Sequence, residues 1–363
     1  MKRAAAALAL VVSFFAVGAR ADTPPTLWDC ARDPGARSRW GLHVRVQQAL
    51  VPPPSSEDLP PLELRRGYEL QLEHARAMLE AADAEHSPDV RLRFDLGAVY
   101  VELGERQRRD DFYERAIAVL APAVDAEPNH PAATKALERL ADAYAHLDRA
   151  PEELSAWRRH LARVTDDRTR VGEMMNMGEA EMRLGLIDDA LATFREVLRL
   201  CGELPNTGGA TYVLTLWDLA VALDRSGDPR GALETAAKAS ATESIASTGM
   251  KMRGSSLIAP HARGGDPAVF FVPEWQREWY LALASAAAAR GAHDPRDAAI
   301  LWADAEAHWD TYVAGSSAGR SGDPWLAVAR VRRDQTHAER LAVEKRAAKL
   351  PRRPPIGGPW IDD

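Results

Sequence analysis

One spacing occurs three times in the sequence. A first apolar stripe contains a small residue, and a second apolar stripe begins twelve positions after that residue. The three pairs are Ala141 and Glu153, Gly178 and Ala190, and Ala220 and Ala232. Stacked helix–turn–helix units produce such a pattern, because small residues allow two helices to approach closely. One unit cannot bury its own apolar face, so it must stack on its neighbours. The spacing therefore predicts an all-α solenoid of repeated helix pairs.

Helical apolar spacing begins near residue 62 and continues to about residue 315. The small residues that would mark the first helix of each pair are Gly97, Ala141, Gly178, Ala220 and Ala284. Their successive separations of 44, 37, 42 and 64 residues are longer than a compact helix pair requires. We therefore expect five pairs over residues 62–315, with long loops between them.

The third pair resembles the tetratricopeptide repeat, which carries W-x2-L-G-x2-Y on its first helix and A-x3-F on its second. The residues that match are Met174, Met177, Gly178, Glu181, Ala190 and Phe194. The resemblance extends over residues 62–315. It implies a superhelical, non-enzymatic scaffold whose first helices line a concave groove for a protein or an extended peptide. On this basis the contact candidates in the first helices are Tyr100, Tyr144 and Glu181.

An insert of about thirty residues, 245–275, interrupts the array, and ordered loops of this length are often functional. The aromatic residues at its end and just after it are further contact candidates: Phe270, Phe271, Trp275 and Trp279. Aromatic side chains contribute strongly to interface energetics, which favours a partner-binding surface. In the alternative, the insert folds back into the groove of the array, because exposed apolar patches are rare on soluble chains.

The first 21 residues have the features of a secretory signal peptide. Lys2 and Arg3 precede an apolar run from Ala4 to Gly18, and Ala19 to Ala21 form a small-x-small cleavage site. An uncleaved membrane anchor is the alternative, although the run is shorter than the about 20 residues that a bilayer requires. We expect export to the periplasm or the envelope of a bacterium.

Export and charge limit the possible partners. Cleavage would remove three basic residues and no acidic one, so the net charge would move from −7 to −10. Such an acidic chain is a poor general binder of nucleic acid. An oxidising compartment also permits a disulfide between Cys30 and Cys201, the two cysteines of the chain. Two separate buried thiols are the alternative.

The remaining segments are interpreted from composition. Residues 22–61 are rich in Pro and are predicted to be irregular. Residues 316–350 would form a Gly- and Ser-rich hinge and a capping helix, and residues 351–363 a disordered tail. Ten Lys and Arg stand against four acidic residues between positions 320 and 353. A second functional hypothesis is therefore an envelope-attached structural spacer, anchored to an anionic surface by this basic region.

One motif suggests chemistry. Gly315 to Gly319 match the G-x-S-x-G nucleophile elbow, with Ser317 as the nucleophile of a hydrolase. The elbow requires a strand before the serine, whereas a helix is expected here, so this is the more distant alternative. No HExxH, CxxC or calcium-loop spacing occurs in the sequence. We therefore predict no metal site and no cofactor.

Overall fold

The computed structural model describes residues 33–52, 61–203, 209–249, 258, 271–319 and 322–351. These residues form thirteen α-helices and two short 3-10 helices, with no strand among them. The predicted all-α fold is confirmed. The elements are α2 (Pro34–Ala49), α3 (Pro61–Ala81), η1 (Ala84–His86), α4 (Val90–Gln107), α5 (Asp110–Ala126), α6 (Ala133–His146), α7 (Ala150–Leu161), α8 (Asp167–Arg183), α9 (Ile187–Glu203), α10 (Ala210–Arg225), α11 (Pro229–Gly249), η2 (Glu274–Gln276), α12 (Arg277–Gly291), α13 (Pro295–Ala318) and α14 (Leu326–Ala347).

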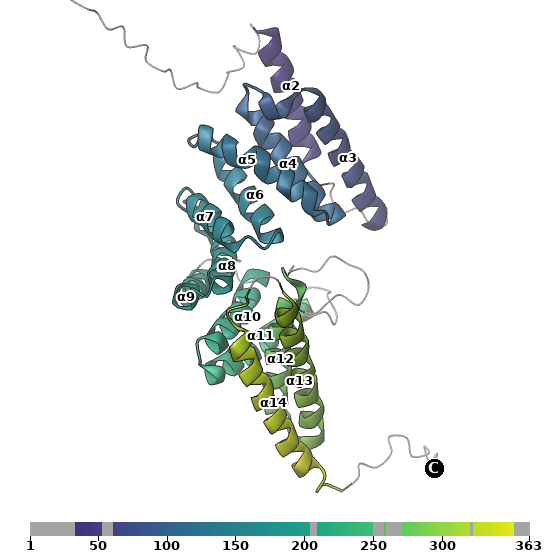
Figure 1. The fold of residues 1–363 in the computed structure, drawn as a ribbon, viewed down its shortest axis with the longest axis vertical. Helices are drawn as coiled ribbons and strands as arrows, with labels where there is room; N and C mark the ends of the chain where they lie inside the picture. The colour runs from purple at the N-terminus through teal and green to yellow at the C-terminus, as the bar shows by residue number, and fades with distance from the viewer. Residues whose placement is uncertain are drawn as a thin grey trace, which may run out of the picture.

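The helices follow one another along a single elongated stack, from α2 at one end to α14 at the other (Figure 1). Consecutive helices pack as pairs, α4 with α5, α6 with α7, α8 with α9, α10 with α11 and α12 with α13. The apolar core is correspondingly divided. One large cluster lies within α2 to α7, and a second lies within α8 to α14. The predicted solenoid of helix pairs is confirmed.

Small residues close each pair. A Cβ added to Gly97 would lie 2.2 Å from Leu120 Cγ, and one added to Gly178 would lie 2.5 Å from Phe194 Cε1. Ala220 takes the same place in the fourth pair and is fully buried. These contacts join residues on the two helices of one pair, so a short, repeated sequence spacing could reveal them.

The fifth pair has a different register from the one expected. Ala284 is only half-buried, whereas Ala286 is buried and lies twelve positions before Ala298. Ala286, Ala298 and Trp302 belong to one apolar cluster. The small residue of this pair is therefore Ala286. The run of alanines in α12 offered several candidates for the small residue, and the twelve-residue spacing of the second, third and fourth pairs selects Ala286.

Two further expectations about irregular structure are corrected. Residues 34–49, predicted to be irregular, form α2. Asp33 caps this helix, because its carboxylate accepts hydrogen bonds from the backbone N–H groups of Gly35 and Ala36. Leu42 and Val46 then bury its apolar side. Long loops were also expected between repeats, but the connections at residues 127–132 and 162–166 are short. The residues beyond those of a compact pair lengthen the helices instead.

The Gly- and Ser-rich hinge is the third correction, since α13 continues as a helix to Ala318. Gly315 allows a close approach: a Cβ at this position would lie 2.5 Å from Trp275 Cγ. The Ser316 hydroxyl is buried and donates a hydrogen bond to Asp323 Oδ2 at 2.7 Å. The Gly- and Ser-rich composition of this segment, which is typical of a linker, is explained here by packing against the end of the insert.

The predicted signal peptide, Cys30 and the C-terminal tail from residue 352 lie outside the described residues. Within the described part of the chain, no helix combines the length and the apolarity that a membrane span requires.

Candidate functional site

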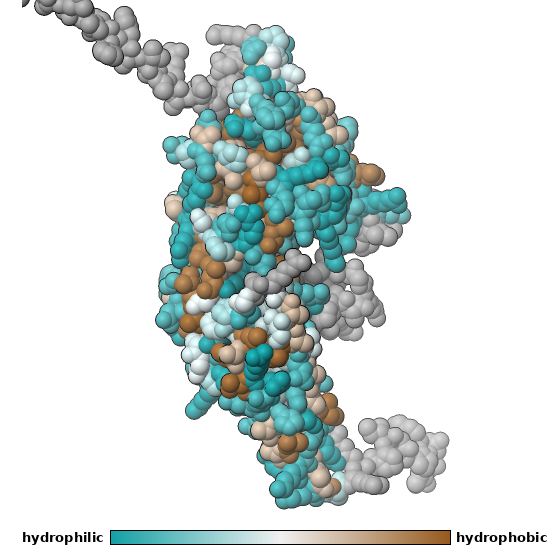
Figure 2. Space-filling model, viewed as in Figure 1, coloured by the Kyte–Doolittle hydropathy of each residue, from teal (hydrophilic) through white to brown (hydrophobic). Residues whose placement is uncertain are grey.

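A cavity of about 90 Å³ is lined by the first helices of four successive pairs, α6, α8, α10 and α12, and by α7, the second helix of one of these pairs. Its walls combine acidic and aromatic side chains. The residues that matter below are Asp142, Glu153, Trp157, Glu179, Arg183, Trp217, Asp218, Arg225, Phe271 and Tyr280. We call this cavity the acidic pocket. The face of the molecule drawn in Figure 2 is mainly hydrophilic, with apolar residues in patches along the array.

The repeat itself aims two of the carboxylates into the pocket. Asp142 and Glu179 directly follow Ala141 and Gly178, the small residues that face the second helix of their pairs. Successive side chains on an α-helix are rotated by about 100°, so the next residue points away from that second helix. Equivalent positions of two neighbouring repeats therefore deliver two carboxylates to the same cavity. Asp218, from α10, completes the group.

The pKa values of these three carboxyl groups are raised. Burial raises the pKa of Asp142 to about 7, and the carboxylate of Glu138 adds to the effect. Burial also raises the pKa of Glu179 to about 7, against the opposing effect of Arg183. The pKa of Asp218 lies well above its ordinary value, first because of burial and then because of Glu179. In all three groups, burial has a larger effect on the pKa than the neighbouring positive charges.

The arginines that line the pocket already interact with other side chains. Arg183 pairs with Glu153 and lies 3.7 Å from Asp148 Oδ1. Arg225 donates a hydrogen bond to Gln276 Oε1 at 2.9 Å and lies 4.5 Å above the ring of Trp279. In contrast, no ion pair to Asp142, Glu179 or Asp218 occurs within the described residues.

Among the three carboxyl groups, Asp218 shows most clearly that a hydrogen-bond donor is missing. Its Oδ1 accepts a hydrogen bond from the Tyr280 hydroxyl at 2.9 Å. Its Oδ2 is buried and receives no hydrogen bond from any described residue. A buried carboxylate oxygen without a donor is costly, so the site favours a ligand that brings a positively charged donor.

Aromatic and aliphatic side chains form the rest of the wall. Trp157 and Trp217 are almost fully buried, and the ring of Phe271 meets Tyr280 edge to face at 5.2 Å. Ile258, the only described residue between positions 250 and 270, is also buried against the pocket. Ile258, Phe271 and Val272 of the insert therefore border the cavity, as in the folded-back alternative.

The aromatic candidates at the end of the insert lie in different environments. Trp275 packs edge to face on Tyr312 at 5.0 Å and against Gly315. Trp279 is fully buried and donates a hydrogen bond from Nε1 to Asp224 Oδ2 at 3.0 Å. Of these aromatic candidates, Phe271 alone lines the pocket among the described residues, and Phe270 lies outside them.

The candidates in the first helices lie away from the pocket. Tyr100 is buried and donates a hydrogen bond to Glu80 Oε1 at 3.0 Å, and Tyr144 lies under the guanidinium of Arg149. Glu181 is buried and accepts a hydrogen bond from the Thr193 hydroxyl at 2.8 Å. Each of the three stands three positions after the small residue, on the same helix face, and so turns toward the second helix. The sequence feature that could have located the pocket is instead the acidic residue one position after the small residue.

Cys201 and Ser317 complete the sequence-derived candidates. Cys201 is buried near the end of α9 without a disulfide partner among the described residues, and its pairing with Cys30 stays a prediction. Ser317 is exposed on the last turn of helix α13. The strand that a nucleophile elbow needs before its serine is replaced here by helix.

The basic C-terminal helix α14 directs several of its cations inward. Arg332 Nε donates to Asp224 Oδ1 at 2.6 Å, and Arg340 Nε donates to Glu306 Oε2 at 2.6 Å. Trp325, just before α14, donates a hydrogen bond from Nε1 to the carbonyl of Met182 at 3.0 Å. These contacts attach α14 to three other helices and account for part of its basic composition by packing.

The comparison with family models agrees with the repeats. Residues 170–242, which run from α8 into α11, match the family model described as the tetratricopeptide repeat. Among solved structures, the chain is similar to the crystal structure of a single-residue variant of the nearly identical TPR-like repeats of a Podospora anserina putative kinesin light chain. That match has 17% identity and a TM-score of 0.41, and covers 60% of this chain and 99% of the other. No curated protein sequence matches the chain. The resemblance inferred from the small residues is thus confirmed over the third and fourth pairs.

Proposed function

We propose that this chain is a non-enzymatic scaffold that holds an extended, basic segment of a partner protein in the acidic pocket. Tetratricopeptide-type arrays generally bind proteins on the surface that their stacked repeats create. One observation carries the finer proposal: three successive repeats place Asp142, Glu179 and Asp218 around one cavity, and none of them has a cation partner within the described residues. A lysine or arginine side chain of the partner would supply that cation.

The dimensions and walls of the pocket suit a side chain and exclude a whole peptide. About 90 Å³ accommodates the end of one long side chain with little room to spare. The apolar stem of lysine or arginine can pack on Trp157, Trp217 and Phe271 while its charged end reaches the carboxylates. Aromatic faces also attract the cation itself. The partner's backbone would then run across the mouth of the pocket along the array.

Binding accounts for the pocket better than catalysis. The side chains that line it include no Ser, Thr, Cys or His among the described residues, so the pocket holds no hydroxyl or thiol nucleophile paired with a histidine base. The N-terminal features of a signal peptide support export, and we propose that the partner is met in the bacterial periplasm or cell envelope.

A peptide library tests the proposal. Extended peptides with randomised flanks would carry lysine, norleucine or glutamate at one central position, and their binding to the purified chain would be measured by fluorescence anisotropy. We expect the lysine peptides to bind best. Glu179→Gln should weaken them about tenfold, roughly 1.4 kcal/mol, and leave the norleucine peptides nearly unchanged.

A matched control is Glu196→Gln on α9, because the Glu196 side chain is 43% exposed and already paired with Arg199 at 2.6 Å. This variant should bind all three libraries as the wild type does. Equal binding of lysine and glutamate peptides, or equal losses in the two variants, would contradict the proposal.

Affinity and stability should respond to pH in opposite directions. Asp142 and Glu179 have pKa values of about 7, so both lose protons between about pH 6 and about pH 8, and a lysine peptide should bind more tightly at the higher pH. Carboxyl groups whose pKa is higher in the folded than in the unfolded chain take up protons on folding. The free chain should therefore lose stability as pH rises from about 4 to about 7. Thermal unfolding with and without peptide at each pH measures both effects, and parallel trends would argue against these groups.

A further inference from the structure

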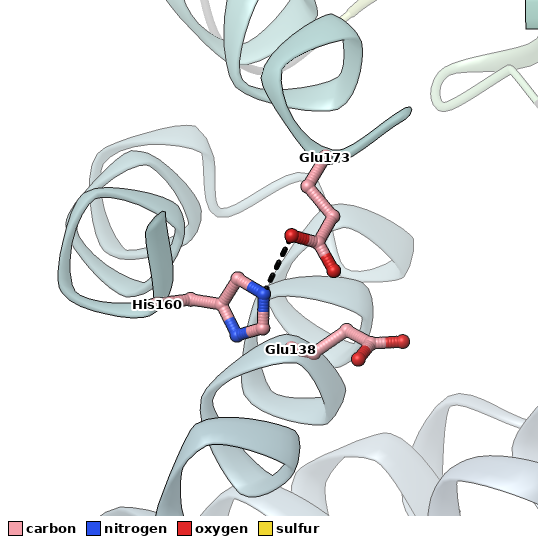
Figure 3. Close-up of side chains that lie close together, drawn as sticks. All are labelled: Glu138, His160 and Glu173. Carbon is pink, nitrogen blue, oxygen red and sulfur yellow. Dashed lines mark ion pairs between the residues drawn. The ribbon is translucent and has the colours of Figure 1, made fainter. Parts of the chain in front are cut away.

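A second group of side chains lies one helical turn from the acidic pocket. Glu138 of α6, His160 of α7 and Glu173 of α8 each offer one ligand atom, and these atoms all lie within 4.8 Å of one another (Figure 3). Figure 3 shows the His160 ring between the two glutamates, with the Glu173 carboxylate turned toward it. We propose that these three residues bind a divalent transition-metal ion, for which Zn²⁺ is the first probe.

The hydrogen bond of the imidazole sets its tautomer. His160 Nδ1 lies 2.7 Å from the carbonyl oxygen of Thr134. A carbonyl oxygen can only accept a hydrogen bond, so Nδ1 carries a proton and donates it. In the neutral imidazole, the lone pair is then on Nε2. Metal-bound histidines commonly have this arrangement, with the other ring nitrogen donating to a backbone carbonyl.

Two buried atoms at the centre of the group lack hydrogen bonds. His160 Nε2 lies 2.8 Å from Glu173 Oε2, yet neither atom makes a hydrogen bond of acceptable geometry with any described residue. His160 is 2% exposed and Glu173 is 9% exposed, so water does not satisfy these atoms easily. A cation placed between these two atoms would contact both lone pairs at once. A single proton on Nε2 could also join the two atoms, but only in a hydrogen bond of poor geometry.

The composition of the group selects the kind of ion. Imidazole favours Zn²⁺ and its neighbours over Mg²⁺ and Ca²⁺, which prefer oxygen ligands alone. Two carboxylates balance the charge of a divalent ion. Three protein ligands also leave one position of a tetrahedral site for water. Glu138 is the ligand that must move, because its carboxylate now pairs with Lys135 on the outer side of α6. Its side chain is 23% exposed, so it can turn without disturbing the core.

No sequence motif marks this group. The three residues lie 22 and 13 positions apart on separate helices, and only the stacking of α6, α7 and α8 brings them together. The short, regular ligand spacings that reveal other metal sites are therefore missing. This explains why the sequence led us to predict none.

The test measures Zn²⁺ binding to the purified chain in excess Mg²⁺ by competition with a chromogenic chelator. We expect one high-affinity Zn²⁺ per chain. Glu138→Gln should reduce the affinity at least about tenfold and keep the helical circular dichroism, because Glu138 is the most exposed ligand. Glu173→Gln should reduce it similarly. In the Co²⁺-loaded chain, His160→Gln should change the visible absorption spectrum.

His308→Gln is the matched control. His308 Nδ1 pairs with Glu278 Oε2 at 2.7 Å on α13 and α12, but this pair is not part of a three-ligand group in the described chain. Its substitution should leave the Zn²⁺ affinity unchanged. Zn²⁺ binding that is the same in Glu138→Gln and the wild type, or no binding above that of Mg²⁺, would show that His160 and Glu173 form only an ion pair.

Discussion

Replacement of Arg332 with leucine is expected to destabilise the chain by about 3–5 kcal/mol, because it leaves a buried carboxylate without its cation. Arg332 Nε donates to Asp224 Oδ1 at 2.6 Å, and its Nη2 reaches the backbone carbonyl of the same residue at 3.2 Å. The Asp224 side chain is only 1% exposed. Its other oxygen accepts the hydrogen bond of Trp279, so one carboxylate joins α10, α12 and α14.

The pH dependence of this variant identifies the cause. Burial raises the pKa of Asp224 even with Arg332 present, and Arg332 opposes that rise. Without the guanidinium, the folded state should prefer the protonated acid more strongly. The loss of stability in Arg332→Leu should therefore be smaller at about pH 5 than at about pH 8, since protonation removes the unpaired charge.

Urea denaturation of three variants measures the effect. Arg340→Leu, on the same helix, breaks ion pairs with Glu306 and Glu344 that are partly open to solvent, so it should cost under about 1 kcal/mol. The double variant Arg332→Leu, Asp224→Asn should recover part of the loss, because no charge remains buried. Equal losses in Arg332→Leu and Arg340→Leu would mean that α14 is held by apolar contacts instead.

The repeat pattern was predictable because its physical basis is local. Gly178 and Phe194 belong to the two helices of one pair, sixteen positions apart, and the corresponding contact in the first pair joins Gly97 and Leu120. The cap of α2 was local too: Asp33 stands directly before Pro34, a typical helix start that the prolines from residue 52 onward obscured. Both features can be read from a short window of sequence.

The sites depended on contacts between repeats, which no short window contains. Asp218 and Tyr280 meet across 62 positions, and Gly315 receives Trp275 across 40. From composition alone, Gly315 indicated flexibility, whereas its packing explains why a side chain is missing there. Similarly, the tyrosine position of the family's pattern favoured Tyr100 and Tyr144, which face the second helices. The pocket residues lie on the neighbouring face of the same helices.

Two glycines of helix α8 should respond to the same substitution with opposite signs. Alanine improves an exposed helix position by up to about 1 kcal/mol over glycine. A Cβ at Gly172 would meet no atom within 4 Å, so Gly172→Ala should stabilise the chain by about 0.5–1 kcal/mol. A Cβ at Gly178 would lie 2.5 Å from Phe194 Cε1, and Phe194 is fully buried. Overpacking of this kind costs about 1–3 kcal/mol or more, so Gly178→Ala should destabilise the chain in spite of its helix propensity.

A second substitution separates overpacking from any other defect in Gly178→Ala. Phe194→Leu removes the ring atoms that a Cβ at position 178 would meet, although alone it leaves a cavity and costs stability. In the double variant the combined loss should be smaller than the sum of the two single losses, because the methyl group introduced at position 178 enters the space left by the ring. Urea denaturation of the four chains gives this coupling energy. Strictly additive losses, or stabilisation by both glycine substitutions, would mean that the small residue at position 178 does not control the distance between α8 and α9.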